Sequence, residues 1–212
     1  MLGPEAENEF GAPYLQVHRA DLHQALAARV PLRSLRLGTE VVGIDQDDRA
    51  AYVTTADGER LGADLVVAAD GVRSAARQWL FGADEAVFSG TAAYRALLPA
   101  AEVADLDLPE YAGRLGPGRH VVRYWVRGGE LLNLVAVFTT EAAEAARESW
   151  TARAEPGEQL REFADWDRRV LTALERAGQV FRYGINTRTP LARWSIGRVT
   201  LLGDSAHAME PF

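Results

Sequence analysis

The sequence contains no cysteine and no lysine, and all 23 of its basic residues are arginine. Without cysteine there are no disulfides, thiolate metal ligands or thiol nucleophiles. Without lysine there is no amine for Schiff-base catalysis or for anchoring a pyridoxal-type cofactor. The two absences therefore exclude covalent catalysis by a thiol or an amine.

The sequence also lacks a basic surplus and a long apolar run. Its net charge is −7 over 212 residues, which argues against nucleic acid, because binding a polyanion requires a basic face. The first ten residues, MLGPEAENEF, have no basic region before an apolar stretch and do not resemble a secretion signal. The longest apolar stretches, LVVAA and LVAVF, are too short to span a membrane. We expect a soluble cytoplasmic protein with no nucleic-acid or membrane partner.

Two short stretches predict buried strands of a parallel sheet. ADLVVAAD at 63–70 and VTLL at 199–202 are continuous, apolar and β-branched, as in strands covered on both faces. Helices are predicted over 19–30 and 72–82 from their apolar spacing. Asp57-Gly58 predicts a hairpin turn between two neighbouring strands. This texture is typical of a nucleotide-type α/β domain.

The middle of the chain predicts a different kind of domain. Its strand candidates are longer, at 91–99, 120–128 and 130–138, and the last two are joined through Gly128-Gly129 as a hairpin. A helical stretch follows over 158–178. We therefore predict an α/β fold, α+β overall, in which a parallel-sheet domain is interrupted by a mixed or antiparallel sheet with helices.

Both predicted parallel strands end in a turn that contains Asp and Gly and leads into a helix. The turns are VVAADGVRS, with Asp70-Gly71, and VTLLGDSAH, with Gly203-Asp204. In open α/β sheets, ligands bind beyond the carboxyl ends of the strands. Glycine lets the backbone approach a ligand, and the following helix start offers N–H groups. Helix capping explains either Asp alone, but two such turns in one chain favour a ligand with hydroxyl and phosphate groups.

These turns resemble a known family. Residues 70–77, DGVRSAAR, fit the D-G-x-charged-S-x-apolar-R motif of single-component flavin-dependent aromatic hydroxylases. Gly203-Asp204, followed by Ala206-His207 and Pro211, is similar to the second flavin motif of that family, and VHRADL at 17–22 to its arginine at a helix start. AAYRALLP and the approach WSIGRVTLLGD resemble most the salicylate and 3-hydroxybenzoate hydroxylase branch.

The resemblance implies a partial FAD-binding domain at residues 1–88 that returns at 189–212, and a substrate domain at 89–188. It implies FAD as cofactor, NAD(P)H as reductant, oxygen and a phenolic small molecule as substrates, and no metal; a homodimer stays open. The cofactor-binding residues that it implies are Arg19, Asp70, Gly71, Arg73, Arg77, Gly203, Asp204 and Pro211.

Individual roles follow from the same resemblance. Arg19 is implied to contact the flavin dinucleotide near its pyrophosphate and ribityl chain; a surface ion pair with Asp21 is the alternative. Asp70 is implied to lie between the flavin and the path of the nicotinamide donor, and Asp204 to hold a ribityl hydroxyl. His207 is expected to stabilise its turn. For Arg73 and Arg77, the alternative to shaping the site is an ordinary solvated helix surface.

His120 and Tyr124 are the candidate catalytic residues. They lie four apart in a predicted strand, so both side chains point to one face. An imidazole beside a phenol can accept or relay a phenolic proton, and relatives acting on hydroxybenzoates and hydroxypyridines use a His and a Tyr at this spacing. The alternative is a pair of structural residues on a half-buried strand. The implied reaction is hydroxylation of a phenolic aromatic acid such as salicylate or hydroxybenzoate.

The sequence departs from the family pattern at both ends. No G-x-G-x-x-G turn precedes Val17, and the glycine turn and long helix expected after Pro-Phe have no counterpart after Phe212. We expect these 212 residues to hold part of the flavin site and to have impaired activity. A catalytically inactive remnant, which binds a partner through an exposed sheet edge, is the non-enzymatic alternative.

A phosphohydrolase of the haloacid-dehalogenase type is a further alternative. There a strand-end Asp attacks phosphate and a later Gly-Asp turn binds magnesium; IDQDD at 44–48 and the turn at Gly203-Asp204 offer such groups. Against it, the later turn carries His207 where an acidic residue is wanted. Asp45–Asp48 also suit an acidic hairpin turn.

Overall fold

The structure, a computed structural model, describes residues 4–141 and 152–210. These residues divide into two compact units. One, the five-stranded unit, contains 4–32, 92–141 and 152–183; the other, the two-sheet unit, contains 33–91 and 184–210. Each unit has its own sheet architecture and is described by itself below.

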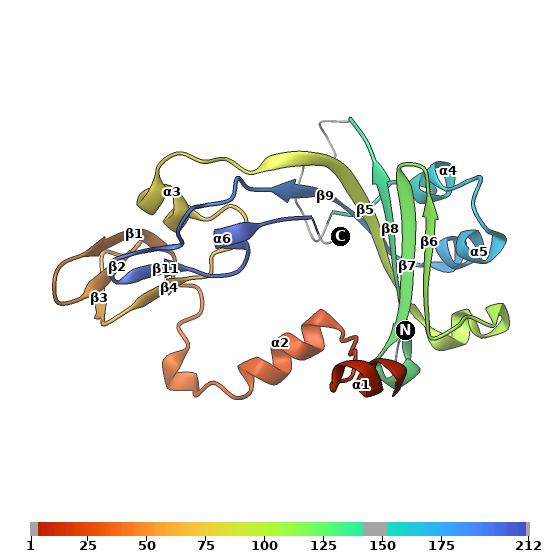
Figure 1. Cartoon of the computed structure of the whole chain (residues 1–212), viewed down its shortest axis with the longest axis horizontal. Coiled ribbons are helices and arrows are strands. Elements are labelled where there is room, and N and C mark those ends of the chain that lie inside the picture. The colour runs from red at the N-terminus through yellow and green to blue at the C-terminus, as the bar shows by residue number, and fades with distance from the viewer. Residues whose placement is uncertain (1–3, 142–151, 211–212) are drawn as a thin grey trace. The chain divides into compact units, whose positions relative to one another are not determined.

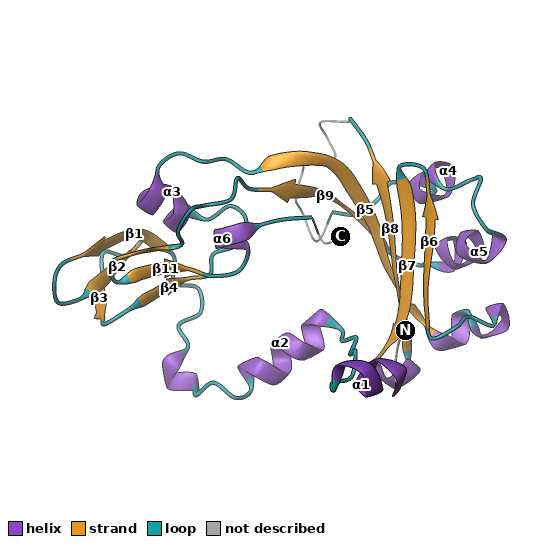
Figure 2. Ribbon diagram, in the orientation of Figure 1, coloured by secondary structure: helices purple, strands orange, loops and turns teal. Residues whose placement is uncertain are grey.

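The five-stranded unit takes its name from one sheet with the strand order β6-β7-β8-β5-β9 (Figures 1 and 2). Its strands are β5 (Val87–Pro99), β6 (Tyr111–Gly116), β7 (Arg119–Val126), β8 (Leu131–Thr139) and β9 (Val180–Thr187). β6, β7 and β8 pair antiparallel. Gly128 and Gly129, with φ of +64° and +95°, allow the tight turn between β7 and β8. The predicted strands and their hairpin are therefore confirmed.

One face of this sheet carries the core of the unit. Tyr94 on β5 stacks on Phe138 of β8 with ring centroids 4.8 Å apart, and Phe163 meets Tyr94 edge-on. Helices α4 (Glu158–Glu162) and α5 (Arg168–Arg176) cover this face, as Figure 1 shows. Each fully buried Leu or Phe here contributes roughly 1.5–3 kcal/mol by leaving water.

The single helix predicted over 158–178 is wrong. The chain breaks after α4, where Phe163 turns into the core and Trp166 packs against its ring at a centroid distance of 5.1 Å. Asp167 then starts α5 by accepting a hydrogen bond from the Arg169 N–H at 2.9 Å. An N-cap inside an apparently continuous apolar pattern begins a new helix.

The first residues of the chain form two helices in this unit, α1 (Pro4–Phe10) and α2 (Arg19–Ala27). α2 confirms the predicted helix, although it ends at Ala27 and none of its residues is buried. Short 3-10 turns lie at Leu32–Ser34, Ala100–Glu102, Ala104–Leu106 and Arg127–Gly129. Among the residues described, no helix has the length and apolarity that a membrane span requires.

The two-sheet unit contains two three-stranded sheets. β1 (Val41–Gln46), β2 (Ala51–Thr55) and β3 (Arg60–Ala63) form an antiparallel sheet; β10 (Ser195–Ile196), β11 (Val199–Leu201) and β4 (Val66–Ala68) form the other, with helices α3 (Ala75–Phe81) and α6 (Asp204–His207) beside it. β11 pairs parallel with β4. The predicted parallel pairing, the helix after residue 72 and the α/β class are confirmed.

The prediction that the parallel strands are buried on both faces is wrong for β4. Ala68 and Leu201 pack into a small core with Ala76 and Ala206, but Val67 is 48% exposed. β4 is the last strand in its sheet, and the residues described cover only one of its faces. The division into units also differs from the predicted boundaries, because residues 4–32 group with the five-stranded sheet.

The acidic segment at 44–48 contains the end of β1 and the start of the hairpin turn to β2. The Asp47 carboxylate accepts hydrogen bonds from the N–H groups of Arg49 and Ala50 at 2.7 and 2.9 Å, and this lowers its pKa. Asp45 pairs with Arg60 on β3. The carboxylates are thus used in the turn, which favours the hairpin interpretation over a phosphohydrolase nucleophile.

Candidate functional site

The two Asp-Gly turns lie side by side at one edge of the parallel sheet. β4 and β11 end together, with Ala68 beside Leu201 in the register. The Leu202 N–H donates to the Ala68 carbonyl at 2.9 Å, and the buried Ser205 hydroxyl lies 2.8 Å from the same oxygen. The structure therefore brings together the two motifs that are far apart in the sequence.

Both turns depend on glycine. Gly71 has a φ of +79° and Gly203 a φ of +65°, in the left-handed region that side chains disfavour. A Cβ atom added at either position would meet nothing within 4 Å. The space that a side chain would fill is open at both turns, so the backbone is accessible to a ligand. This observation fits a cradle for a flavin dinucleotide.

The two aspartates have different surroundings. Asp70 accepts hydrogen bonds from the Ser74 hydroxyl at 2.6 Å and from the Ala76 N–H at 3.1 Å, so part of its role is to organise the start of α3. The exposed Asp204 carboxylate accepts no hydrogen bond from the residues that the structure describes. Asp204 is therefore available to hold a ligand hydroxyl.

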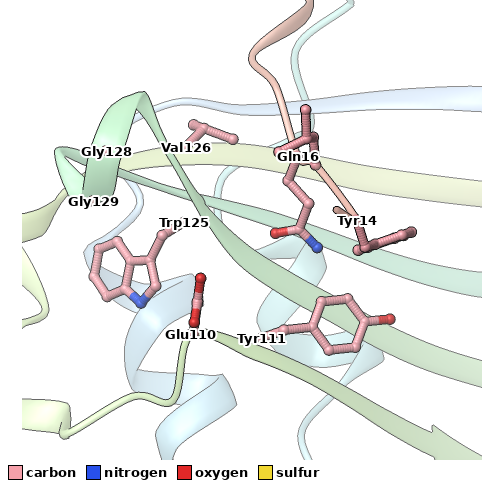
Figure 3. Close-up of a pocket in the computed structure, with 9 residues that line it drawn as sticks. Tyr14, Gln16, Glu110, Tyr111, Trp125, Val126, Gly128 and Gly129 are labelled. Carbon is pink, nitrogen blue, oxygen red and sulfur yellow. The ribbon is translucent and has the colours of Figure 1, made fainter. Parts of the chain in front are cut away.

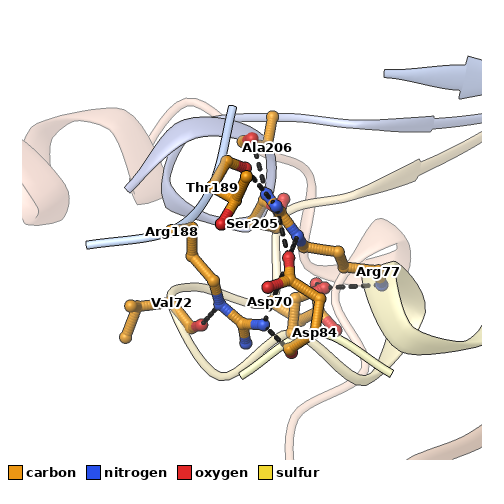
Figure 4. A network of polar contacts seen from close by, with 9 residues as sticks. Asp70, Val72, Arg77, Asp84, Arg188, Thr189, Ser205 and Ala206 are labelled. Atoms are coloured by element: carbon orange, nitrogen blue, oxygen red, sulfur yellow. Dashed lines mark hydrogen bonds and ion pairs between the residues drawn. The ribbon is translucent and has the colours of Figure 1, made fainter. Parts of the chain in front are cut away.

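Arg77 braces the second turn from inside the protein (Figure 4). Its side chain is fully buried. Its guanidinium pairs with the Asp84 carboxylate and donates to the backbone carbonyls of Thr189 at 2.5 Å and Ala206 at 2.8 Å. Because its N–H groups are used within the protein, Arg77 holds the turn in place and does not present a cation at its surface.

Arg188 joins the same cluster. The Arg188 Nε donates to the Val72 carbonyl at 2.7 Å. The Arg188 Nη1 donates to the backbone carbonyl of Asp84 and lies 3.7 Å from the Asp84 carboxylate. Two buried guanidinium groups thus share one carboxylate. Sequence reasoning missed Arg188 and Asp84, because neither falls in a motif and nothing in the sequence signals their burial.

The remaining predicted residues of this unit are placed as follows. Arg73 is exposed on the first turn. The His207 ring packs on Trp194 at a centroid distance of 4.9 Å, and the His207 backbone N–H donates to the Gly203 carbonyl at 3.0 Å. Pro211 lies outside the described residues.

The candidate catalytic residues lie in the five-stranded unit. His120 and Tyr124 are both on β7, and the register puts Tyr124 beside Asn133 of β8. Val121 and Arg123, which alternate with them, are buried towards the face that α4 and α5 cover. His120 and Tyr124 are therefore half-buried on the opposite face.

That opposite face forms one wall of a cavity of about 500 Å³. β5 and β9 contribute Arg95, Leu97, Phe181 and Tyr183; α2 and the residue before it contribute His18, Arg19, Ala20 and His23. Arg19 thus shares a cavity with Arg95, which sequence reasoning did not select. The alternative of a pair between Arg19 and Asp21 is not observed; Asp21 pairs with Arg127 at 2.6 Å and with His18.

The charged side chains that line this cavity are the two arginines. Its lining includes two arginines and two histidines and no carboxylate. Burial lowers the pKa of His120, which keeps its imidazole neutral and able to accept a proton near neutral pH. Burial raises the pKa of Tyr183, and the charge of Arg95 opposes that rise. The cavity is suited to an anion with an apolar body.

A second cavity of about 380 Å³ differs in this respect. Tyr14, Gln16, Tyr111 and Trp125 line it, and the Glu110 carboxylate lies among them (Figure 3). A carboxylate in the lining disfavours an anionic ligand. These two cavities therefore differ in the sign of the charge that lines them.

Two glycine turns at one edge of the parallel sheet are typical of a cofactor-binding protein, and the five-stranded unit carries a His and a Tyr on one face of its sheet. The family described as FAD binding domain matches residues 13–212, and the chain belongs to this FAD-binding family. The family resemblance found in the sequence is thus confirmed.

Three relatives illustrate the match. 3-Amino-4-hydroxybenzoate 2-monooxygenase of Streptomyces platensis is 34% identical, over 100% of this chain and 53% of its own length. 6-Hydroxynicotinate 3-monooxygenase of Bordetella bronchiseptica is 32% identical, over 99% and 55%. A salicylate hydroxylase substrate complex superposes with a TM-score of 0.78 at 30% identity, over 92% of this chain and 52% of that one. The chain therefore spans about half the length of these relatives.

Proposed function

We propose that these residues belong to an FAD- and NAD(P)H-dependent monooxygenase that hydroxylates a phenolic aromatic acid such as salicylate or a hydroxybenzoate. The observation that carries the proposal is the half-buried His120–Tyr124 face beside a cavity lined by cations and apolar groups. Family membership supports FAD as the cofactor. The relatives named above, which act on hydroxylated aromatic rings by their names, support the substrate class.

In this proposal the two units have separate tasks. Gly71 and Gly203 would leave space for the cofactor, Asp204 would accept a hydrogen bond from a ribityl hydroxyl, and Arg19 would contact the pyrophosphate. Bound FAD, reduced by NAD(P)H, supplies the activation of oxygen. The chain itself has to bind the ring, orient it, and remove its phenolic proton.

His120 and Tyr124 perform the proton transfer. A neutral His120 accepts the phenolic proton, either directly or through the Tyr124 hydroxyl, and the resulting phenolate is the more reactive ring. The Tyr124 hydroxyl has no hydrogen-bond partner among the residues described, so it is available to the substrate. The apolar side chains of Leu97 and Phe181 exclude water from the cavity.

Cofactor binding tests the first half of the proposal. The chain is titrated with FAD, and flavin fluorescence and the quenching of its five tryptophans are followed. We expect saturable binding that Asp204→Asn weakens roughly 10-fold, as for one hydrogen bond to a charged group. Asp48→Asn, at an exposed hairpin, is the matched control. A folded wild-type chain that binds no FAD contradicts the proposal for these residues.

Product formation tests the second half. With FAD and NAD(P)H present, hydroxylated product from salicylate or 3-hydroxybenzoate is measured by chromatography alongside NAD(P)H consumption. His120→Gln and Tyr124→Phe should lower product formation by about 10²–10⁴-fold, the range for proton-transfer groups. Equal turnover of wild type and both variants would show that the two residues have only structural roles.

A partner-binding fragment is the second candidate. The observation that favours it is the exposed apolar segment around α2, where Leu15 and Leu32 expose 79% and 86% of their surface. Contiguous exposed apolar residues promote association. Sedimentation analysis separates the two candidates: a monomer that unfolds cooperatively and binds FAD supports the enzyme, and self-association without FAD binding supports the fragment.

A further inference from the structure

Arg95 differs in its contacts from the arginines of the chain that pair with a carboxylate. Its Nε donates to the Asn133 Oδ1 at 3.2 Å, its two terminal nitrogens make no hydrogen bond to the residues described, and Arg95 is among the residues that line the cavity. Several other arginines pair with a carboxylate: Arg36, Arg60, Arg77, Arg119, Arg127, Arg176, Arg182 and Arg188. Arg95 has no carboxylate partner in the described part of the chain.

Asn133 explains why Arg95 points where it does. Asn133 is 2% exposed, and its Nδ2 has no hydrogen-bond partner in the structure. A buried donor without a partner lowers stability, and an apolar side chain at this place would avoid that cost. The Asn133 Oδ1 accepts the Arg95 Nε–H, and this hydrogen bond holds the Arg95 guanidinium on the face of the sheet that lines the cavity.

The sheet register relates Arg95 to the catalytic pair. Asn133 lies beside Tyr124 across β8 and β7, and it binds Arg95 on β5, the next strand on the other side. The strands β5 and β7 are therefore two strand spacings, roughly 10 Å, apart. One aromatic ring can span that separation when it has a carboxylate at one end and a hydroxyl at the other.

Resting on the proposed function, we propose that Arg95 is the group that binds the carboxylate of the aromatic acid, and that Asn133 is the residue that positions it. The planar fork of a guanidinium matches a carboxylate with two parallel hydrogen bonds. The apolar wall of Leu97 and Phe181 accommodates the ring, and the Tyr124 side receives the phenol. Arg95 then selects acids over neutral phenols.

The test compares an acid with its neutral amide. Salicylate and salicylamide are titrated into the wild-type chain and into Arg95→Gln, and binding is measured by calorimetry without flavin. We expect wild type to prefer salicylate, and Arg95→Gln to bind salicylate about 10- to 100-fold more weakly with salicylamide unchanged. Arg95→Lys should keep part of the preference, because the charge remains but the fork is lost.

Asn133→Leu tests the positioning role separately. This variant removes the acceptor of the Arg95 Nε–H together with the unpaired Asn133 Nδ2, and the half-buried Arg95 can turn its Nε–H to water, so the fold should persist while the preference for the acid falls. Thermal unfolding of each variant confirms that it is folded, and Glu110→Gln, in the other cavity, is the matched control. An unchanged preference for the acid in Asn133→Leu would overturn its positioning role, and the same result in Arg95→Gln would overturn the anchor.

FAD titration of the same proteins distinguishes this inference from the proposed function. Arg95→Gln should bind FAD as wild type does, because Arg19 is the residue assigned to the pyrophosphate. Weaker FAD binding in Arg95→Gln, with unchanged salicylate binding, would assign Arg95 to the cofactor and overturn the anchor. A chain that prefers salicylate through Arg95 but binds no FAD would support the anchor and overturn the proposed cofactor.

Discussion

Two arginine environments distinguish the two units. In the two-sheet unit, Arg77 is fully buried, and its guanidinium is surrounded by Asp84 and by backbone carbonyls. In the five-stranded unit, Arg95 makes one hydrogen bond through Nε and presents its terminal nitrogens to a cavity. The first arginine has its donors satisfied by the fold, whereas the second keeps them available.

This difference separates structural from ligand-binding charge. A buried guanidinium is tolerated when a carboxylate and several carbonyls compensate it, and Arg77 and Arg188 together achieve this around Asp84. Arg95 has no such compensation among the residues described, so an anion is the group that would complete its surroundings. Position in a sequence motif does not predict which case applies: Arg77 lies in the flavin motif and is structural.

The largest expected effect contrasts these two arginines directly. Arg77→Gln removes the buried hydrogen bonds to the Asp84 carboxylate and to the carbonyls of Thr189 and Ala206, and should lower the free energy of unfolding by about 3–5 kcal/mol. Arg95→Gln, at a half-buried site, should change it by less than about 1 kcal/mol. Urea denaturation followed by tryptophan fluorescence measures both.

Arg193→Gln is the control for the first variant, because Arg193 is exposed in the same unit and has no partner among the residues described. Its stability should match wild type within about 0.5 kcal/mol. If Arg77→Gln and Arg95→Gln destabilise the chain equally, the distinction between a structural and a ligand-binding arginine is wrong.

A smaller effect is expected at the glycines of the two units. Gly71→Ala places a side chain at a φ of +79°, which should lower the free energy of unfolding by about 1–2 kcal/mol. The new Cβ also fills the open space at the turn, so FAD affinity should fall. Denaturation and FAD titration are both measured on this variant.

Gly113→Ala is the matched change in the five-stranded unit. Gly113 lies in β6 outside the left-handed region, and a Cβ there also meets nothing within 4 Å. This variant should be neutral or stabilised by about 0.4–1 kcal/mol and should bind FAD as wild type does. Equal FAD binding by Gly71→Ala and wild type would remove the turn from the proposed cofactor site.

The sequence predicts the elements of the fold better than their burial. The strands around Ala68 and Leu201 and their parallel pairing follow from β-branched runs that end in Asp-Gly turns. The apolar pattern does not reveal that one face of β4 is exposed, because burial depends on which segments cover the sheet. The sequence does not predict the break between α4 and α5, because Asp167 is also compatible with an exposed position inside a helix. The structure shows that its side chain caps the start of α5.

The site follows the same rule. Asp70, Gly71, Gly203 and Asp204 were predictable because turns that require positive φ restrict residue type locally. Arg95 and Asn133 were not, since their relation depends on the pairing of strands that are distant in sequence. The sequence also does not predict that Arg77 and Arg188 share the Asp84 carboxylate, because tertiary packing brings these residues together.

The smallest expected effect concerns pH and His120. His120 lies on β7 between Leu115 and Val137 of the neighbouring strands, and burial lowers its pKa. The unfolded chain, with a histidine pKa of about 6.5, therefore binds a proton more readily than the folded chain. Stability should fall as the pH is lowered through about 6.5 towards the folded pKa.

Urea titrations at a series of pH values test this sign. His120→Gln should flatten the decline between about pH 6.5 and 5, whereas Tyr124→Phe removes no group that titrates there and should keep it. A wild-type stability that rises as the pH is lowered, and a rise that His120→Gln abolishes, would mean that the folded chain prefers the imidazolium. His120 would then donate a proton near neutral pH, and the phenolic proton would need a different acceptor.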